Sequence, residues 1–279
     1  MEFRILGPVE LEVSGEVIGI GPLKQRSVLV PLIIDVRRPV MLDALVSRVW
    51  DDSPPSEVRN VLYTYVTRLR RILERAEGCS GERIELRRQS GGYLLDVEPE
   101  RVDLHRFESL MARSRRVTDD EERARLQRQA LSLWRGTPLA DLRGAWFGRV
   151  REWIERRRLE ALSEWAGTEL RLGRPLTVIE EFGRVVTEQP YAEAIIEQLL
   201  LALSSAGRPM EALELYAAAR RRIIDAIGAE PGPSLRRTHE AILREEVGIA
   251  RAGGGATPPG APPRGGGSPR RGERAGGGG

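Results

Sequence analysis

Apolar and polar residues alternate at the beginning of the chain and again near residue 90. From Phe3 to Ile18, apolar residues recur at alternate positions with two interruptions, which predicts short strands joined by turns. Two further alternating runs, 84–88 and 93–97, flank the sequence Gln-Ser-Gly-Gly at 89–92. Because glycine readily adopts the positive φ angles of tight turns, this segment predicts a β-hairpin.

Three segments between these strands have helical spacing, at 24–34, 42–50 and 56–76. Pro31 should kink or shorten the first helix, because proline lacks the amide hydrogen that a helix interior uses. Ser56 is a candidate N-cap of the third helix. Strands, three helices and a closing hairpin predict a winged helix-turn-helix, in which the third helix enters the major groove of DNA and the hairpin is the wing.

The two faces of the third helix differ in character. Leu62, Val66, Leu69 and Leu73 fall at helical spacing and should pack inward. The other side and its flanks carry Asn60, Tyr63, Thr64, Thr67, Arg68, Arg70 and Arg71. An ordinary surface helix with solvated arginines and a DNA-reading helix both fit this pattern, but the place of the helix between a two-helix scaffold and a hairpin favours DNA.

Thr64, Thr67 and Arg68 are the candidates for contacts with base edges, because arginine forms two hydrogen bonds with guanine and threonine contacts the thymine methyl group. The residues expected to contact phosphates or to support the helix are Asn60, Tyr63, Arg70 and Arg71. Near the tip of the hairpin, Arg87 and Arg88 are candidates for an adjacent minor groove, whose negative potential attracts arginine. Strand alternation puts them on opposite faces, and the sequence leaves open which one reaches DNA.

Beyond residues 97–101 the strand pattern ends and helical spacing takes over. Gly-Arg-Pro occurs at 173–175 and again at 207–209, an offset of 34 residues that is the period of tetratricopeptide (TPR) repeats. Phe182 and Tyr216 repeat with the same offset. We therefore predict three parts: an α+β winged-helix domain (1–98), an all-α TPR-like domain (99–250) and a disordered tail rich in Gly, Pro and Arg (251–279).

The net charge does not locate a DNA-binding surface. It is +3 for all 279 residues, but −1 over 1–98, 0 over 99–250 and +4 over the tail. A DNA-binding surface must therefore be judged from where the arginines lie. The runs at 156–158 and 220–222 lie near several carboxylates and are expected to be solvated and partly paired.

An enzyme is the main alternative from another class, and the sequence offers it little. His105 and His239 lie on different predicted helices without further ligands at metal spacing, so surface roles are expected for both. Neither the phosphate-binding P-loop nor the GxSxG motif is present, and we expect no catalytic site, cofactor or metal. Cys79 is the only cysteine, and no apolar run approaches the roughly 20 residues of a membrane span, so a cytoplasmic protein is expected.

Several short motifs occur in a fixed order along the chain. In the first half they are Leu6-Gly7-Pro8, Lys24-Gln25-Arg26, Leu45 to Trp50 followed by Pro54-Pro55, Tyr65 to Arg71, and Gly91-Gly92-Tyr93. In the second half they are Val102-Asp103, Phe107-Glu108, Leu133-Trp134-Arg135-Gly136, Gly207-Arg208-Pro209 with Tyr216, and Gly228 to Pro233. From residue 3 to about residue 245, this order resembles the Streptomyces antibiotic regulatory protein (SARP) family.

The resemblance implies an OmpR/PhoB-type winged helix followed by a bacterial transcriptional activation domain. It further implies an activator that binds direct repeats in promoter DNA as two copies and recruits RNA polymerase holoenzyme, for an antibiotic biosynthetic gene cluster. On the same ground Pro54 and Pro55 are candidates for the polymerase contact, with a plain loop as the equal alternative. Two departures from the family are Pro31 and Met41, which stands where a capping Ser or Thr is common. The alternative function is a TPR-type scaffold whose winged helix does not bind DNA.

Overall fold

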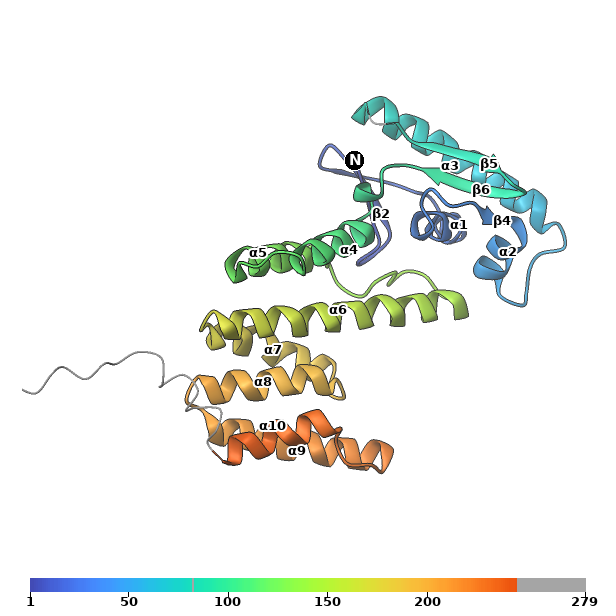
Figure 1. Ribbon diagram of the computed structural model, residues 1–279. Helices are drawn as coiled ribbons and strands as arrows, with labels where there is room; N and C mark the ends of the chain where they lie inside the picture. Colours follow the sequence, from blue (N-terminus) through green and yellow to red (C-terminus); the bar gives the residue numbers. More distant parts are fainter. Residues whose placement is uncertain (82, 245–279) are drawn as a thin grey trace, which may run out of the picture.

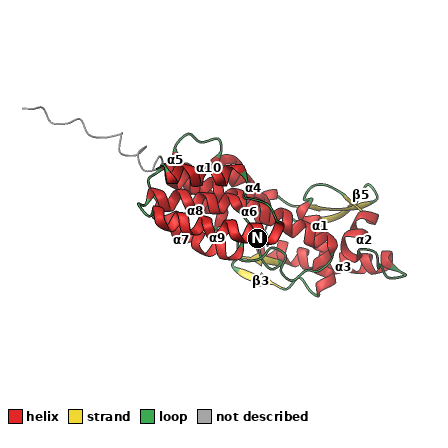
Figure 2. Cartoon of the chain, turned by 90° about the horizontal axis from the view of Figure 1, so that it is seen from below, coloured by secondary structure: helices red, strands yellow, loops and turns green. Residues whose placement is uncertain are grey.

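The computed structural model describes residues 1–81 and 83–244 (Figure 1). Two small sheets and three helices form the N-terminal part, and stacked helices form the remainder, as Figure 2 shows by secondary structure. The predicted fold class, an α+β winged helix followed by an all-helical TPR-like domain, is confirmed. The tail predicted at 251–279 lies outside the described residues.

The strands are β1 (Glu2–Arg4), β2 (Glu10–Val13), β3 (Glu16–Ile18), β4 (Val40–Met41), β5 (Glu85–Gln89) and β6 (Gly92–Asp96). The helices of the N-terminal part are α1 (Leu23–Ile34), α2 (Leu42–Trp50) and α3 (Val58–Ser80). After the 3-10 turn η1 (Pro99–Arg101) come α4 (Asp103–Ser114), α5 (Asp120–Leu131), α6 (Ala145–Arg171), α7 (Pro175–Glu188), α8 (Glu193–Ser205), α9 (Pro209–Ile227) and α10 (Pro233–Leu243).

The predicted hairpin is present as β5 and β6. The short strand β4 pairs with the other edge of β6, which gives the sheet order β4-β6-β5. Ser90 (φ 52°) and Gly91 (φ 78°) form the two-residue turn between paired Gln89 and Gly92. Positive φ at both central residues matches the right-handed twist of the strands. Position 92 admits only glycine, because a Cβ atom there would overlap the main chain of β4.

The third helix differs from its prediction at both ends. It begins at Val58 rather than at Ser56, and Ser56 is not its N-cap; the Val58 amide donates to the carbonyl of Pro55 (3.1 Å), so Ser56 belongs to the preceding turn. It continues through Gly78 to Ser80 and ends at Gly81, which has φ 69° and donates to Glu77 (2.8 Å). The predicted end at residue 76 is therefore too early: Gly78 lies inside the helix, where one glycine costs only about 1 kcal/mol.

The first two helices follow their predicted ranges. α1 continues past Pro31 to Ile34, so the proline does not shorten it. The Asp35 amide donates to the carbonyl of Pro31 (3.1 Å), which closes the last turn. Met41 occupies the N-cap of α2 without a side-chain hydrogen bond, as its identity predicts.

The hydrophobic core does not divide where the strand pattern ends. One cluster of buried residues runs from Phe3 to Ala161 and combines the winged helix with α4, α5 and the first half of α6. A second cluster, from Leu162 to Ile242, joins the second half of α6 to α7–α10. α6 therefore connects the two cores, and Figure 1 shows it crossing the molecule between them.

A buried carboxylate fastens the N-terminal strand to the helical part. Asp103, 2% exposed at the start of α4, accepts hydrogen bonds from the amides of Ile5 (2.9 Å), Leu6 (2.9 Å) and Leu104 (2.8 Å). Burial raises the pKa of Asp103 to about 6, although these amides and Arg135 act in the opposite direction. The Leu6-Gly7-Pro8 segment also docks on the loop after α5, where Arg135 and Leu139 donate to the carbonyls of Leu6 and Gly7 (both 2.8 Å).

The 34-residue repeat is present in the backbone geometry. Gly173 and Gly207 both have φ 76°, and the arginines that follow have φ −114° and −115°. The backbone amide of Arg174 donates to the carbonyl of Glu169, and that of Arg208 donates to the carbonyl of Leu203, at 2.9 Å in each case. α9 ends at Ile227 and is capped by Gly228 (φ 68°), ahead of the Pro-Gly-Pro segment at 231–233.

His105 joins α4 to the C-terminal end of α1. Its Nε2 lies 3.1 Å from the carbonyl oxygen of Ile34 and 3.3 Å from that of Ile33, so Nε2 carries the proton. Burial lowers the pKa of His105, but Glu108 and the two carbonyls outweigh it and raise the pKa above 6.5. Both histidines are half-buried, and His239 stacks on Tyr216 (3.8 Å), so each packs against neighbours at the edge of the surface.

The charge of His105 should make stability depend on pH. Because its pKa is higher in the folded state, its contribution is complete below pH 6.5 and is lost as pH rises through the folded pKa. Urea unfolding of the wild type and of His105→Gln across this range should show a difference in unfolding free energy that shrinks as pH rises. A difference that stays constant or grows would contradict this role.

Candidate nucleic-acid interface

The polar side of α3 is open to solvent, and its apolar side is buried. The exposed residues are Asn60, Tyr63, Thr64, Arg68 and Arg71, and Thr67 is half-buried. On the opposite side, Leu62, Val66, Leu69 and Leu73 are at most 2% exposed and belong to the first core. α3 thus presents a polar face to solvent while its apolar stripe holds it on the scaffold.

The small polar residues of this face bond within the helix. The hydroxyl of Thr64 donates to the carbonyl of Asn60 (3.0 Å), and that of Thr67 donates to the carbonyl of Tyr63 (2.9 Å). The Asn60 amide donates to Glu57 (2.9 Å). Because both hydroxyl protons are already bonded, a threonine contact with a base through its methyl group needs no rearrangement.

Arg70 ties α3 to the wing. Its Nε donates to the carbonyl oxygen of Leu86 in β5 at 2.7 Å, and the side chain is half-buried. Of the two roles that the sequence suggested for Arg70, this contact favours support over phosphate binding. The wing is thereby fixed relative to α3.

The two wing arginines are held differently. Arg87 lies 3.4 Å from Asp96, which pairs in register with Glu85, two residues farther from the turn. The guanidinium of Arg87 is therefore drawn away from the tip. Arg88 is exposed, one residue closer to the turn, and pairs in register with Tyr93.

Sequence reasoning missed Arg59. It is exposed in the first turn of α3 and lies four residues before Tyr63 and eight before Thr67, which puts all three on one side of the helix. The same spacing rule applied backwards from Tyr63 would have found it. Arg59 extends the polar face toward the N-terminus of α3.

Pro54 and Pro55 lie in the exposed α2–α3 loop, which we define as residues 51–57. The loop is short and bonded to the helices at both ends: the Ser53 amide donates to the carbonyl of Trp50 in α2 (3.0 Å), and the Val58 amide of α3 donates to that of Pro55 (3.1 Å). Both prolines are accessible, which is compatible with a plain loop and with a contact surface.

The Lys24-Gln25-Arg26 motif stabilises the scaffold and does not join the polar face of α3. Lys24 Nζ donates to the carbonyl of Val49 (2.9 Å), and buried Gln25 donates to that of Ile20 (2.6 Å). Arg26 pairs with Asp141, whose other oxygen accepts from the Val9 amide (3.2 Å).

The two arginine runs are partly paired, as predicted, and two of their guanidinium groups also stack on tryptophan rings. Arg157 lies over the ring of Trp153 and Arg158 over that of Trp134, each at 5.4 Å. Arg220 bonds Glu230 through Nε (2.7 Å). These contacts hold Arg157, Arg158 and Arg220 against neighbouring side chains of the helical part.

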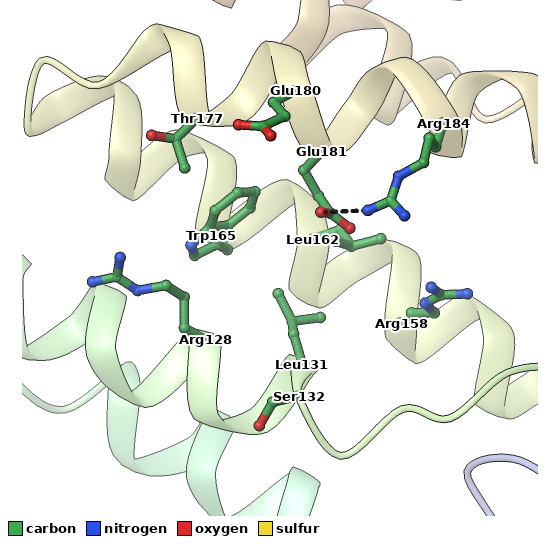
Figure 3. Close-up of a pocket in the computed structure, with 10 residues that line it drawn as sticks. All are labelled: Arg128, Leu131, Ser132, Arg158, Leu162, Trp165, Thr177, Glu180, Glu181 and Arg184. Atoms are coloured by element: carbon green, nitrogen blue, oxygen red, sulfur yellow. Dashed lines mark hydrogen bonds and ion pairs between the residues drawn. The ribbon is translucent and has the colours of Figure 1, made fainter.

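A groove of about 380 Å³ lies between α5, α6 and α7, away from α3 (Figure 3). Leu131, Leu162 and Trp165 form its apolar part, and Glu181 pairs with Arg184 (3.2 Å) at its rim. Across residues 1–81 and 83–244, no group of His, Cys, Asp and Glu is arranged to hold a metal ion. In the same part of the chain, no helix has the length and apolar character to cross a membrane.

Comparison with known proteins identifies both parts of the chain. Residues 102–243 match the family described as bacterial transcriptional activator domain. Residues 21–95 match the family described as transcriptional regulatory protein, C terminal. The second match contains α1–α3 and the wing.

Matches to three relatives cover 88–91% of this chain, although the relatives differ in length. The regulatory protein DnrI of Streptomyces peucetius is 33% identical, with 91% of this chain and 96% of the relative covered. The transcriptional regulator RedD of Streptomyces coelicolor is 34% identical, with 88% and 71% covered. Regulatory protein AfsR of Streptomyces griseus is 30% identical, and the match covers 90% of this chain but 25% of that longer protein.

A solved structure has the same fold. Mycobacterium tuberculosis EmbR, determined in complex with a low-affinity phosphopeptide, is 31% identical and superposes with a TM-score of 0.78. The match covers 90% of this chain and 69% of EmbR. The chain therefore belongs to the SARP family of transcriptional regulators, with an OmpR/PhoB-type winged helix and a bacterial transcriptional activator domain.

Proposed function

We propose that this protein activates transcription by binding direct repeats in promoter DNA and recruiting RNA polymerase holoenzyme. α3 lies in the major groove in this proposal, with Thr64, Thr67 and Arg68 at base edges. The phosphate contacts come from Asn60, Tyr63 and Arg71, together with Arg59. The single observation that supports it most is the exposed polar face of α3 beside a wing fixed by Arg70.

Two copies bind head to tail on the direct repeats, each with its α2–α3 loop toward the polymerase. Pro54 and Pro55 at the exposed tip of this loop are the proposed contact. The relatives DnrI and RedD are Streptomyces regulators, which supports an antibiotic or other secondary-metabolite gene cluster as the target.

Selection of sites from random duplexes, followed by gel shifts with the enriched sequence, tests the DNA-binding step. We expect enrichment of two directly repeated half-sites and binding at least about 10³-fold tighter than to unrelated DNA. The logarithm of the binding constant should fall linearly with the logarithm of salt concentration, since counterions are released from phosphates. Absence of enrichment together with absence of a salt slope would favour the TPR-type scaffold.

The wing provides a separate test, because its two arginines are held differently. We expect Arg88→Ala to weaken binding by about tenfold, the order of one charge-assisted contact, and Arg87→Ala to have a smaller effect. The matched pair is compared by gel shift on duplexes with A-tract and mixed sequence flanking the half-site. A larger effect of Arg87→Ala would reverse the assignment of the minor-groove contact.

A further inference from the structure

The long helix α6 begins against the α2–α3 loop. Asp51, the first residue of the loop, accepts a hydrogen bond from the Ala145 amide (3.2 Å) through Oδ2. This amide belongs to the first turn of α6, where amides have no partner inside the helix. Asp51 therefore caps a helix of the activator domain with a side chain from the winged helix, 94 residues earlier in the sequence.

The residue before α6 is fitted to this contact. Gly144 has φ 128°, a conformation that favours glycine. A Cβ atom at this position would lie 2.9 Å from Oδ2 of Asp51. A side chain at residue 144 would thus displace the carboxylate, so the contact depends on both residues.

A second contact joins the same two elements. The guanidinium of Arg48 in α2 lies 5.1 Å from the ring centroid of Trp146 and bonds Asp35 at 2.5 Å. Trp146 in turn packs edge-on against Phe147, which is fully buried in the first core. Two contacts therefore join the end of α2 to the start of α6: the Asp51–Ala145 hydrogen bond and the stacking of Arg48 on Trp146.

α6 extends from this contact into the second core. Its N-terminal end lies beside α2, and the helix then crosses to the TPR-like repeats (Figure 1). Leu162 and Trp165, in its second half, pack in the second core with residues of α7–α10. One continuous helix thus links the repeats to the loop that carries Pro54 and Pro55.

We infer that Asp51 is a positioning residue through which the activator domain sets the conformation of the α2–α3 loop for its contact with polymerase. The inference rests on the proposed function, since it deepens the role of that loop. Asp51 itself has φ 49°, so the loop leaves α2 in a conformation that L-residues rarely adopt without support. Loss of the cap frees this segment, and the loop then spends less time in the conformation that meets polymerase.

The experiment compares Asp51→Ala with Asp51→Asn in the full chain. Both retain a Cβ atom at the strained position, but only asparagine keeps an oxygen that accepts from Ala145. We expect Asp51→Ala to lower activated run-off transcription by about fivefold, the factor by which loss of one capping acceptor shifts a two-state equilibrium. Asp51→Asn should remain within about twofold of wild type, and both should bind the selected DNA with wild-type affinity.

Gly144→Ala reaches the same contact from the other side and should reproduce the loss of transcription. Gly136→Ala is its matched control, because Gly136 has a similar positive φ (135°) but no atom lies within 4 Å of a Cβ placed there. Undiminished transcription with both Asp51→Ala and Gly144→Ala would overturn the inference. A parallel loss of DNA affinity would also overturn it, since the defect would then lie in DNA docking.

The double variant Pro54→Ala, Pro55→Ala separates this inference from the proposed function. If that variant lowers transcription and Asp51→Ala does not, the loop meets polymerase but Asp51 does not position it. If the proline variant has no effect on transcription, the proposed polymerase contact is wrong. If both lower it and their combination lowers it no further, the two changes act through the same loop.

Discussion

Asp103→Ala should lower the free energy of unfolding by about 3 kcal/mol or more, because it leaves the buried amides of Ile5, Leu6 and Leu104 without an acceptor. Each unsatisfied buried donor costs about 1–3 kcal/mol. The loss should appear in urea or thermal unfolding. The substitution weakens the attachment of the segment after β1 to α4, and with it the core that the winged helix shares with the activator domain.

Asp119→Ala is the matched control for this prediction. Asp119 also accepts a backbone hydrogen bond, from Glu122 (2.9 Å), but it is an exposed N-cap of α5. Its loss should cost about 1 kcal/mol. If the two alanine variants were equally destabilised, Asp103 would be an ordinary cap and not an anchor between distant segments.

The pH dependence of stability gives an independent check on Asp103. Its pKa is about 6 in the folded state, above the ordinary value of 3.8. Folding therefore favours the protonated carboxyl. Its contribution to the free energy of unfolding is complete below pH 3.8 and is lost as pH rises through the folded pKa of about 6. The wild type should show this loss relative to Asp103→Asn, which has no carboxyl group to titrate there.

Arg68→Ala should weaken binding to the selected operator by about 1–3 kcal/mol and relax the preference for one base pair. The reason is that a guanidinium bonds two acceptors on the guanine edge and few on other bases. Binding-site selection with the variant and a comparison of gel shifts on single-base-pair variants of the operator measure both effects.

Arg71→Ala is the matched comparison on the same helix face. A phosphate contact has no sequence preference, so its loss should weaken binding to all duplexes alike and reduce the magnitude of the salt slope by about 1. If Arg68→Ala left the selected sequence unchanged, the assignment of Arg68 to a base edge would be wrong. If Arg71→Ala altered the sequence preference, the two roles would be exchanged.

Much of the fold could be predicted from local patterns. The range of α2, the hairpin and the 34-residue repeat all follow from hydrophobic periodicity and from glycine or proline at turns. The errors occurred where local signals compete. Gly78 lies inside α3 although it indicates a helix end, and Ser56 belongs to a turn although it is a good capping residue.

The candidate site was found from the sequence because a surface helix displays its periodicity directly. The polar and apolar sides of α3 were separable by spacing alone, and their exposure agrees with that division. The sequence could not predict that Arg70, Arg87 and Arg88 make different contacts. Arg70 bonds Leu86 in the wing, and Arg87 pairs with Asp96 on the neighbouring strand. Strand register and helix-to-wing distance decide such contacts.

The sequence by itself determined which segments are helices and strands, which side of α3 is polar, and which motifs recur, since each of these is a property of neighbouring residues. Only the tertiary structure decided that the winged helix and the activator domain share one core, that Asp103 anchors β1, and that Asp51 caps α6. These contacts join residues more than 90 positions apart. Periodicity reports on a few helical turns at most, so it contains no information about partners at that separation.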